Sequence, residues 1–376
     1  MPLGFVITEW TEDQGLTVTY SHPESLDIDL DDMMRIFYAH ITGAGEAGNV
    51  LVRLEKARSN VSSYFTGMES NRPLMINLML ELGEDPEMFG EAVILEMNAT
   101  ILNYLIQMGA DISQKYETTQ ELIKYLKDAL FLLDRLKNLT REQRLAQIYT
   151  SQKGRTILGI LQDRALFRKD LLGILEEKLN KIISNIEITL DPFIKTGLVK
   201  QDWVEGNTDI TLFLLSDFAI YRAPATKFIE DSRKNLPSPA LATKYYQEAT
   251  NFFINYKPTL EDSLKIASNM INPDKYDYIT LFRDRAYPLN KIPRGPGESV
   301  EQIGNFLKAM EEDRIITILK DESNVEWVFL LTDVVTDTFY PEYLIEKIRS
   351  YRMEGTLNKN VAIKHLDLLE EVYKKK

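Results

Sequence analysis

The stretch Leu179–Arg222, LNKIISNIEITLDPFIKTGLVKQDWVEGNTDITLFLLSDFAIYR, decides the fold of the second half of this 376-residue chain. Its apolar spacing predicts a helix that stops at Gly197, where a left-handed residue commonly closes a helix. A strand, a turn at Gly206-Asn207 and a second strand should follow. Two further helices are expected just before this stretch, in the segments GRTILGILQDR and FRKDLLGILEEK. Residues 151–225 therefore read as three helices followed by a hairpin.

This order is that of a winged-helix domain, and FIKTGLVKQ and WVEGNTDITLFLLS resemble the arsenic-repressor type of archaeal winged helix. Phe193 stands where that family carries leucine. A similar plan returns over residues 258–340, with helices expected at Leu260–Met270 and Ser299–Asp313 and a strand pair around Glu322-Ser323-Asn324. That segment resembles a second, more divergent winged helix. The resemblance implies DNA binding, which is the usual task of the family.

Residues 1–112 alternate strand and helix patterns in the order strand, strand, helix, three strands, helix. This order resembles the longin-like (profilin-like) fold, in which an antiparallel sheet packs between helices. The resemblance implies a binding module for small GTPases or trafficking-type partners. The alternative is that another small α+β domain shares the order.

Three helical segments complete the expected α+β multidomain fold. They are a connector at 113–150, a bridge at 226–257 and a tail at 341–376. Capping-box spacing at Thr118 and Thr140 predicts that a helix begins at each of these residues in the connector. The whole combination resembles archaeal, Asgard-like proteins that join a longin-like domain to winged helices.

The net charge of −13 is concentrated at the N-terminus. Residues 1–100 hold 5 Lys+Arg against 17 Asp+Glu, and the remaining residues are nearly neutral. An acidic domain is repelled by phosphate backbones and anionic membranes, so it should face protein partners. With no cysteine, no signal-peptide pattern and no apolar run long enough to span a membrane, we expect a cytoplasmic protein.

No motif predicts catalysis. The glycines of Gly43–Gly48 match G-x-G-x-x-G, but the strand-before, helix-after context of a dinucleotide site is missing. The three histidines lack metal-ligand spacing. We therefore predict a protein that is not an enzyme and that uses no cofactor or metal, although a site built from carboxylates would leave only a weak signal.

Charge also decides the interpretation of the third helices. The outward positions of the first, Lys181, Ser184, Asn185, Glu187, Ile188 and Asp191, include one basic and two acidic residues. Asp202, Glu205 and Asp209 add negative charge around the hairpin, and Glu298, Glu301, Glu311 and Glu312 outnumber Lys308 in the second module. The sequence thus favours a protein-interaction scaffold or adaptor.

The alternative is a transcriptional regulator with an N-terminal sensing domain. Its contacts to a nucleic-acid backbone would come from basic residues near the first three helices: Lys153, Arg155, Arg168, Lys169 and Lys181.

Overall fold

The computed structural model describes residues 2–42, 46–89, 91–110, 115–180, 183, 186–206, 208–294 and 300–375. The chain divides into two compact units, Met1–Asn138 and Leu139–Lys376. Each unit mixes helices with antiparallel strands. The boundary lies inside the segment 113–150, so the two connector helices belong to different units.

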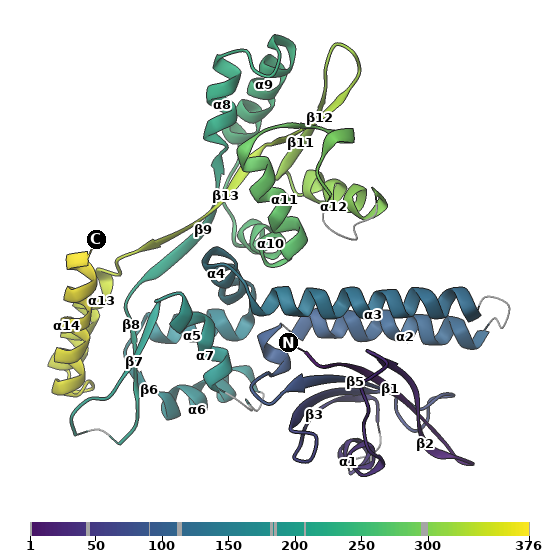
Figure 1. Cartoon of the computed structure of the whole chain (residues 1–376). Coiled ribbons are helices and arrows are strands. Elements are labelled where there is room, and N and C mark those ends of the chain that lie inside the picture. The colour runs from purple at the N-terminus through teal and green to yellow at the C-terminus, as the bar shows by residue number, and fades with distance from the viewer. Residues whose placement is uncertain are drawn as a thin grey trace. The chain divides into compact units, whose positions relative to one another are not determined.

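Unit 1 has the expected order of elements. They are β1 (Gly4–Thr11), β2 (Gly15–His22), α1 (Leu30–Ile41), β3 (Gly48–Leu54), β4 (Ser59–Phe65), β5 (Leu74–Glu81), a short 3-10 helix (Pro86–Met88), α2 (Glu91–Ala110) and α3 (Lys115–Lys137). The strands form one antiparallel sheet in the order β2-β1-β5-β4-β3. In Figure 1, α1 lies on one side of this sheet and α2 with α3 on the other.

Both faces of the central strands are buried because helices cover each side. Side chains alternate between the faces along a strand. Val6 and Met79 therefore join the core beneath α1, whereas Phe5 and Ile7 point to the opposite face. Asp29 caps α1 by accepting a hydrogen bond from the backbone N–H of Asp32 at 2.7 Å.

The helix start predicted at Thr118 is wrong. α3 already includes Lys115, and Thr118 is buried within it. The hydroxyl of Thr119 donates to the carbonyl of Lys115 at 2.7 Å, so it bonds back within the helix instead of capping it. The start predicted at Thr140 is confirmed, because Thr140 and Gln143 form a reciprocal capping box.

Unit 2 consists of two copies of one plan. The first repeat contains α4 (Arg141–Thr150), α5 (Gln152–Leu161), β6 (Leu166–Phe167), α6 (Arg168–Leu179), α7 (Ile186–Lys195), β7 (Val199–Asp202), β8 (Thr211–Leu214), β9 (Asp217–Pro224), α8 (Thr226–Arg233) and α9 (Pro239–Asn255). Gly197 has φ +75°, as expected for the residue that ends the third helix.

The second repeat follows the same order. It contains α10 (Leu260–Ile271), α11 (Pro273–Asp284), β10 (Tyr287–Pro288), a 3-10 helix (Leu289–Lys291), α12 (Val300–Glu312), β11 (Ile316–Lys320), β12 (Glu326–Leu330), β13 (Thr332–Phe339), α13 (Tyr343–Met353) and α14 (Lys359–Lys375). The small sheets correspond as well, β6-β8-β7 to β10-β12-β11. The sequence patterns missed α11 and did not separate β9 and β13 from the hairpin strands before them.

The strands β9 and β13 pair with each other and join the repeats. LLSD at 214–217 recurs as LLTD at 330–333, which makes Asp217 equivalent to Asp333 and Ile220 to Thr336. In the antiparallel pair, Asp217 lies opposite Phe339, Asp333 lies opposite Ala223, and Ile220 lies opposite Thr336. Because Ile220 faces its own equivalent, a local two-fold axis passes through this pair.

The helix pair that ends each repeat packs on the other repeat. Figure 1 shows α8 and α9 beside β11 and β12, and α14 beside β7 and β8. The aromatic ring of Tyr245 in α9 stacks on Phe329, and its hydroxyl donates to the carbonyl of Leu330 at 3.0 Å. His365 in α14 lies edge-on to Phe213, and its Nε2 donates to the carbonyl of Leu214 at 2.9 Å. Each core is therefore completed by helices of the other copy.

The packing of each repeat's last two helices on the other repeat leads to a prediction about stability. Leu368→Ala in α14 should lower the free energy of unfolding of unit 2 by about 2–5 kcal/mol, because a buried leucine is replaced by a cavity. Urea unfolding measures the loss. Hydrogen exchange should rise first in β7 and β8, although the mutated helix belongs to the second repeat.

Leu366→Ala, on the same helix at a half-exposed position, is the control and should cost less than about 1 kcal/mol. Preferential loss of protection in β11 and β12 would contradict the packing of α14 on the first repeat.

Candidate functional site

The basic residues predicted to contact nucleic acid are partly occupied by the fold itself. Arg155 donates from Nη1 to the carbonyls of Tyr149 at 2.6 Å and Thr150 at 2.8 Å, and so closes the C-terminal end of α4. Lys153 is half-buried and has an interaction partner, and Lys169 is exposed. Lys181 lies outside the described residues. The structure therefore brings four of the five residues onto α5 and α6.

Arg168 is paired with the third helix and the hairpin. Its Nη1 lies 2.6 Å from the Glu187 carboxylate of α7, and its Nη2 lies 4.0 Å from Asp209. Asp209 also accepts a hydrogen bond from the backbone N–H of Lys169 at 3.0 Å, at the start of α6. A carboxylate at a helix N-terminus is stabilising. Glu187 and Asp209 thus offset the positive charge of Arg168.

Two further carboxylates near the first hairpin form ion pairs within unit 2, whereas Glu205 is exposed. Asp191 pairs with Lys195 at 2.8 Å, and Asp202 pairs with Lys364 of α14 at 2.8 Å. The hydrogen bond from Lys364 lowers the pKa of Asp202. The pair of Asp202 and Lys364 ties the hairpin to α14 of the second repeat. Sequence patterns could not show this, because the partners lie 162 residues apart (Asp202 and Lys364).

Trp203, at the start of the first hairpin loop, is 61% exposed. In the second module, α12 ends with Glu311 and the exposed Glu312, and Lys308 is exposed. Glu298 lies outside the described residues. The described surface of the third helices is thus mixed in charge.

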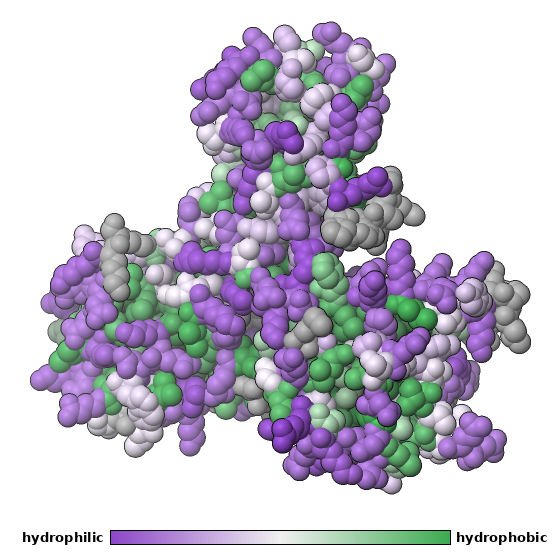
Figure 2. Space-filling model, viewed as in Figure 1, coloured by the Kyte–Doolittle hydropathy of each residue, from purple (hydrophilic) through white to green (hydrophobic). Residues whose placement is uncertain are grey.

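Unit 1 carries an exposed apolar stripe on α1. Leu30 is 58% exposed and Tyr38 is 53% exposed, and the partly buried Met34 lies between them at helical spacing. The neighbouring strand β3 is the last strand of the sheet, and within the described residues it pairs with β4 alone. In Figure 2, apolar residues of this unit gather above α1, over the sheet and towards the α2–α3 pair, and hydrophilic residues prevail at the lower edge.

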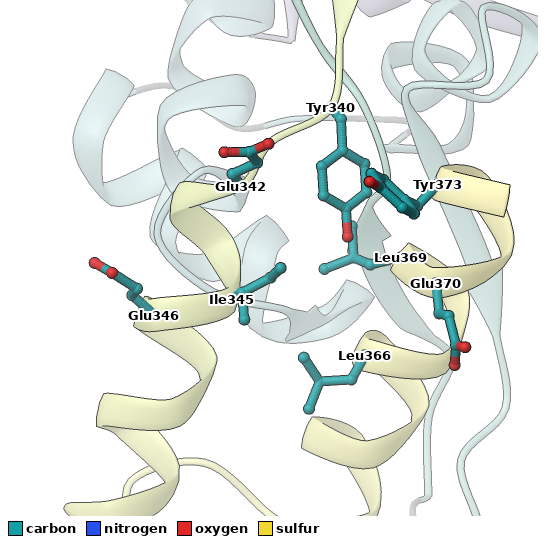
Figure 3. Close-up of a pocket in the computed structure, with 8 residues that line it drawn as sticks. All are labelled: Tyr340, Glu342, Ile345, Glu346, Leu366, Leu369, Glu370 and Tyr373. Carbon is teal, nitrogen blue, oxygen red and sulfur yellow. The ribbon is translucent and has the colours of Figure 1, made fainter. Parts of the chain in front are cut away.

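A groove lies between α13 and α14 in unit 2, with a cavity volume of about 510 Å³. Its apolar surface comes from the buried Leu369 and the partly exposed Ile345 and Leu366. Tyr340 and Tyr373 stand together at one end, with ring centroids 5.4 Å apart. Figure 3 shows Ile345 and Leu366 between the two helices, and carboxylates on both sides.

The rim of the groove carries acidic side chains. The carboxylates at its rim are Glu342, Glu346 and Glu370, and none of the described residues that line it is basic. The pKa of the Tyr340 hydroxyl is raised, first by burial and then by the negative charge of Glu342 and Glu370 and by Tyr373. A site with this lining suits a cationic group that also buries apolar surface.

Sequence reasoning missed this groove because the segment 341–376 reads as a helical tail. A signal was present. α14 carries one apolar stripe that is buried against the first repeat, at Val361, His365 and Leu368. A second stripe, Leu366, Leu369 and Tyr373, runs beside it along the groove. The apolar arc is thus wider than one packing face requires.

In the described part of the chain, no group of three or more His, Asp or Glu side chains is placed to hold a metal ion. His40 shares a 2.8 Å hydrogen bond with Ser63, and His365 packs in the core. The first three residues of the glycine motif, 43–45, lie outside the described residues. Among the described helices, none is long and apolar enough to span a membrane.

Comparison with family models, curated proteins and solved structures finds no match to this chain.

His40 predicts a pH dependence of stability in unit 1. Burial lowers the pKa of His40 to about 4, below its usual value of 6.5. Below pH 6.5 the unfolded chain therefore binds a proton that the folded chain does not, and stability is lost as the pH falls towards 4. We expect a loss of about 2 kcal/mol between pH 7 and 4.5 from this group.

Urea unfolding followed through the fluorescence of Trp10 measures the effect in a chain that carries Trp203→Phe and Trp327→Phe, since Trp10 stacks on Phe37 of α1. His40→Gln should flatten this pH dependence. An unchanged slope in the variant would show that other groups cause it.

Proposed function

We propose that this protein is a non-enzymatic adaptor, in which a longin-like unit 1 docks a small GTPase or trafficking-type partner. The two repeats of unit 2 act as winged-helix modules that make protein contacts. The observation that carries the proposal is the nearness of two features: β3, which pairs only with β4 among the described residues, and the apolar stripe of the exposed Leu30 and Tyr38 with the partly buried Met34 on α1. An edge strand offers unpaired backbone groups to a partner strand, and an exposed tyrosine is a frequent hot spot.

The order of elements in unit 1 supports the longin-like assignment, and so does a five-stranded antiparallel sheet between α1 and the α2–α3 pair. The charge supports a protein ligand over a phosphate-rich one, because 17 of the first 100 residues are acidic and 5 are basic. Three helices followed by a hairpin, present in both repeats, support the winged-helix assignment.

The alternative, a DNA-binding regulator, has less support. Recognition of DNA draws on arginine and lysine side chains that are free to meet phosphates and bases. Arg155 is bonded to backbone carbonyls, and Arg168 is paired with Glu187 of the helix that would enter the groove.

The docking proposal predicts the effect of changing the α1 stripe. Leu30→Asp with Tyr38→Asp should reduce recovery of a small GTPase by the full chain at least about tenfold, because hot-spot loss costs about 2 kcal/mol or more. Val18→Asp, at an exposed position on β2, is the control and should leave recovery unchanged.

Affinity capture with quantitative mass spectrometry makes this comparison, followed by calorimetry with the purified GTPase in its GTP and GDP forms. The proposal fails if the wild-type chain recovers no GTPase, or if the double variant recovers as much as the wild type.

The charge pairing predicts weak nucleic-acid binding. In gel-shift titrations at about 50 and 200 mM salt, the wild-type chain should give no binding with the steep salt dependence of phosphate contacts. Salt-sensitive binding would favour the DNA-binding regulator if replacing five basic residues abolishes it. The substitutions are Lys153→Gln, Arg155→Gln, Arg168→Gln, Lys169→Gln and Lys181→Gln.

A further inference from the structure

The acidic rim of the groove between α13 and α14 has no counterpart of equal charge on the corresponding helices of the other repeat. The corresponding helices α8 and α9 complete the other core in the same way, with Phe228 buried where Leu344 is buried, and Tyr245 where His365 lies. The positions equivalent to Glu342, Glu346 and Glu370 are Thr226, Glu230 and Thr250. The α13–α14 pair therefore carries three carboxylates at positions where the α8–α9 pair carries one. Because both helix pairs perform the same packing, the fold does not require the acidic rim.

The rim carboxylates are also available to a ligand. Within the described residues, no ion pair engages Glu342 or Glu346, and both side chains are exposed. Glu370 pairs with Lys374 one turn along α14, but this pair is largely exposed, and such pairs contribute little. An incoming cation can therefore replace Lys374 at small cost.

Apolar and aromatic side chains inside this rim are left in contact with water. Tyr373 is 65% exposed, and Ile345 and Leu366 are each about two-fifths exposed. The tyrosine pair beside Glu342 and Glu370 offers ring faces and carboxylates together, which suits a lysine or arginine side chain. A cavity of about 510 Å³ takes several side chains of a segment that lies along it.

We propose that this groove binds a basic amphipathic helical segment of a partner protein, with leucine-like side chains on Ile345 and Leu366 and a lysine or arginine against the exposed ring of Tyr373. The charge complementarity selects this occupant, because an acidic or neutral helix would leave the rim carboxylates desolvated without partners. The inference rests on the proposed adaptor function and names the chemistry of a second partner, separate from the α1 surface.

The test uses the full chain and a synthetic peptide of about 15 residues, with leucine on one helical face and lysine on the other. Fluorescence anisotropy should show binding of this peptide, and binding at least about tenfold weaker for the same peptide with glutamate in place of lysine. The groove variant Glu342→Gln, Glu346→Gln, Glu370→Gln should weaken binding of the lysine peptide at least about tenfold and reduce its salt dependence.

A charge-matched control separates the groove from general acidity. The variant Glu12→Gln, Asp13→Asn, Glu69→Gln removes an equal number of negative charges at exposed positions of unit 1. It should leave the affinity for the lysine peptide nearly unchanged. Glu230→Gln, at the equivalent position of α8, should also have no effect. Equal weakening by the groove and control variants would overturn the proposal, as would equal binding of the glutamate peptide.

Hydrogen exchange of the wild-type chain provides a readout that does not depend on the variants. The lysine peptide should protect α13 and the C-terminal half of α14 and leave α8 and α9 unchanged. Protection confined to unit 1 would overturn the proposal. If the lysine peptide does not bind but the chain still recovers a GTPase, only the groove proposal is rejected. If the peptide binds but no GTPase is recovered, only the docking role of unit 1 is rejected.

Discussion

The pairing of β9 with β13 is the constraint on which unit 2 depends. Each strand follows the hairpin of its own repeat and lies outside that repeat's three-stranded sheet. The antiparallel register of β9 and β13, centred on Ile220 and Thr336, carries each chain segment past the local two-fold axis. The helices that follow can then reach only the core of the other repeat. Neither copy buries its hairpin with its own residues alone, so the two copies should fold and unfold together.

Equivalent positions keep the same role with different chemistry. Tyr245 and His365 both donate to the last carbonyl of a hairpin strand. Gln162 and Arg283 both donate to the aspartate that begins a long strand, at 2.8 Å in each case. A buried donor that loses its acceptor is costly, which keeps these contacts while the residue types change. Surfaces outside these contacts are under no such restriction, and the acidic groove has diverged there.

Local patterns predicted most elements, and non-local contacts explain what they missed. The order in unit 1, the capping box at Thr140 and the end of the third helix at Gly197 depend on neighbouring residues. The β9–β13 pair joins residues more than a hundred positions apart, such as Ile220 and Thr336. The apolar spacing in α9 and α14 indicates that one face of each helix is buried, but it does not indicate which repeat that face packs against. Similarly, Glu187 could be placed on the outward face of a helix, but its pairing with Arg168 could not.

The groove shows how exchange can create a binding surface. A helix that packs only on its own module needs one apolar face, and its remaining surface can be polar. α14 packs on the first repeat through Leu368 and at the same time lies beside α13, so it exposes a second apolar stripe at the edge of both contacts. Leu366 and Tyr373 belong to this stripe and are too exposed to add much to the core. Their apolar surface, bordered by Glu342 and Glu370, is better explained by an external partner than by stability.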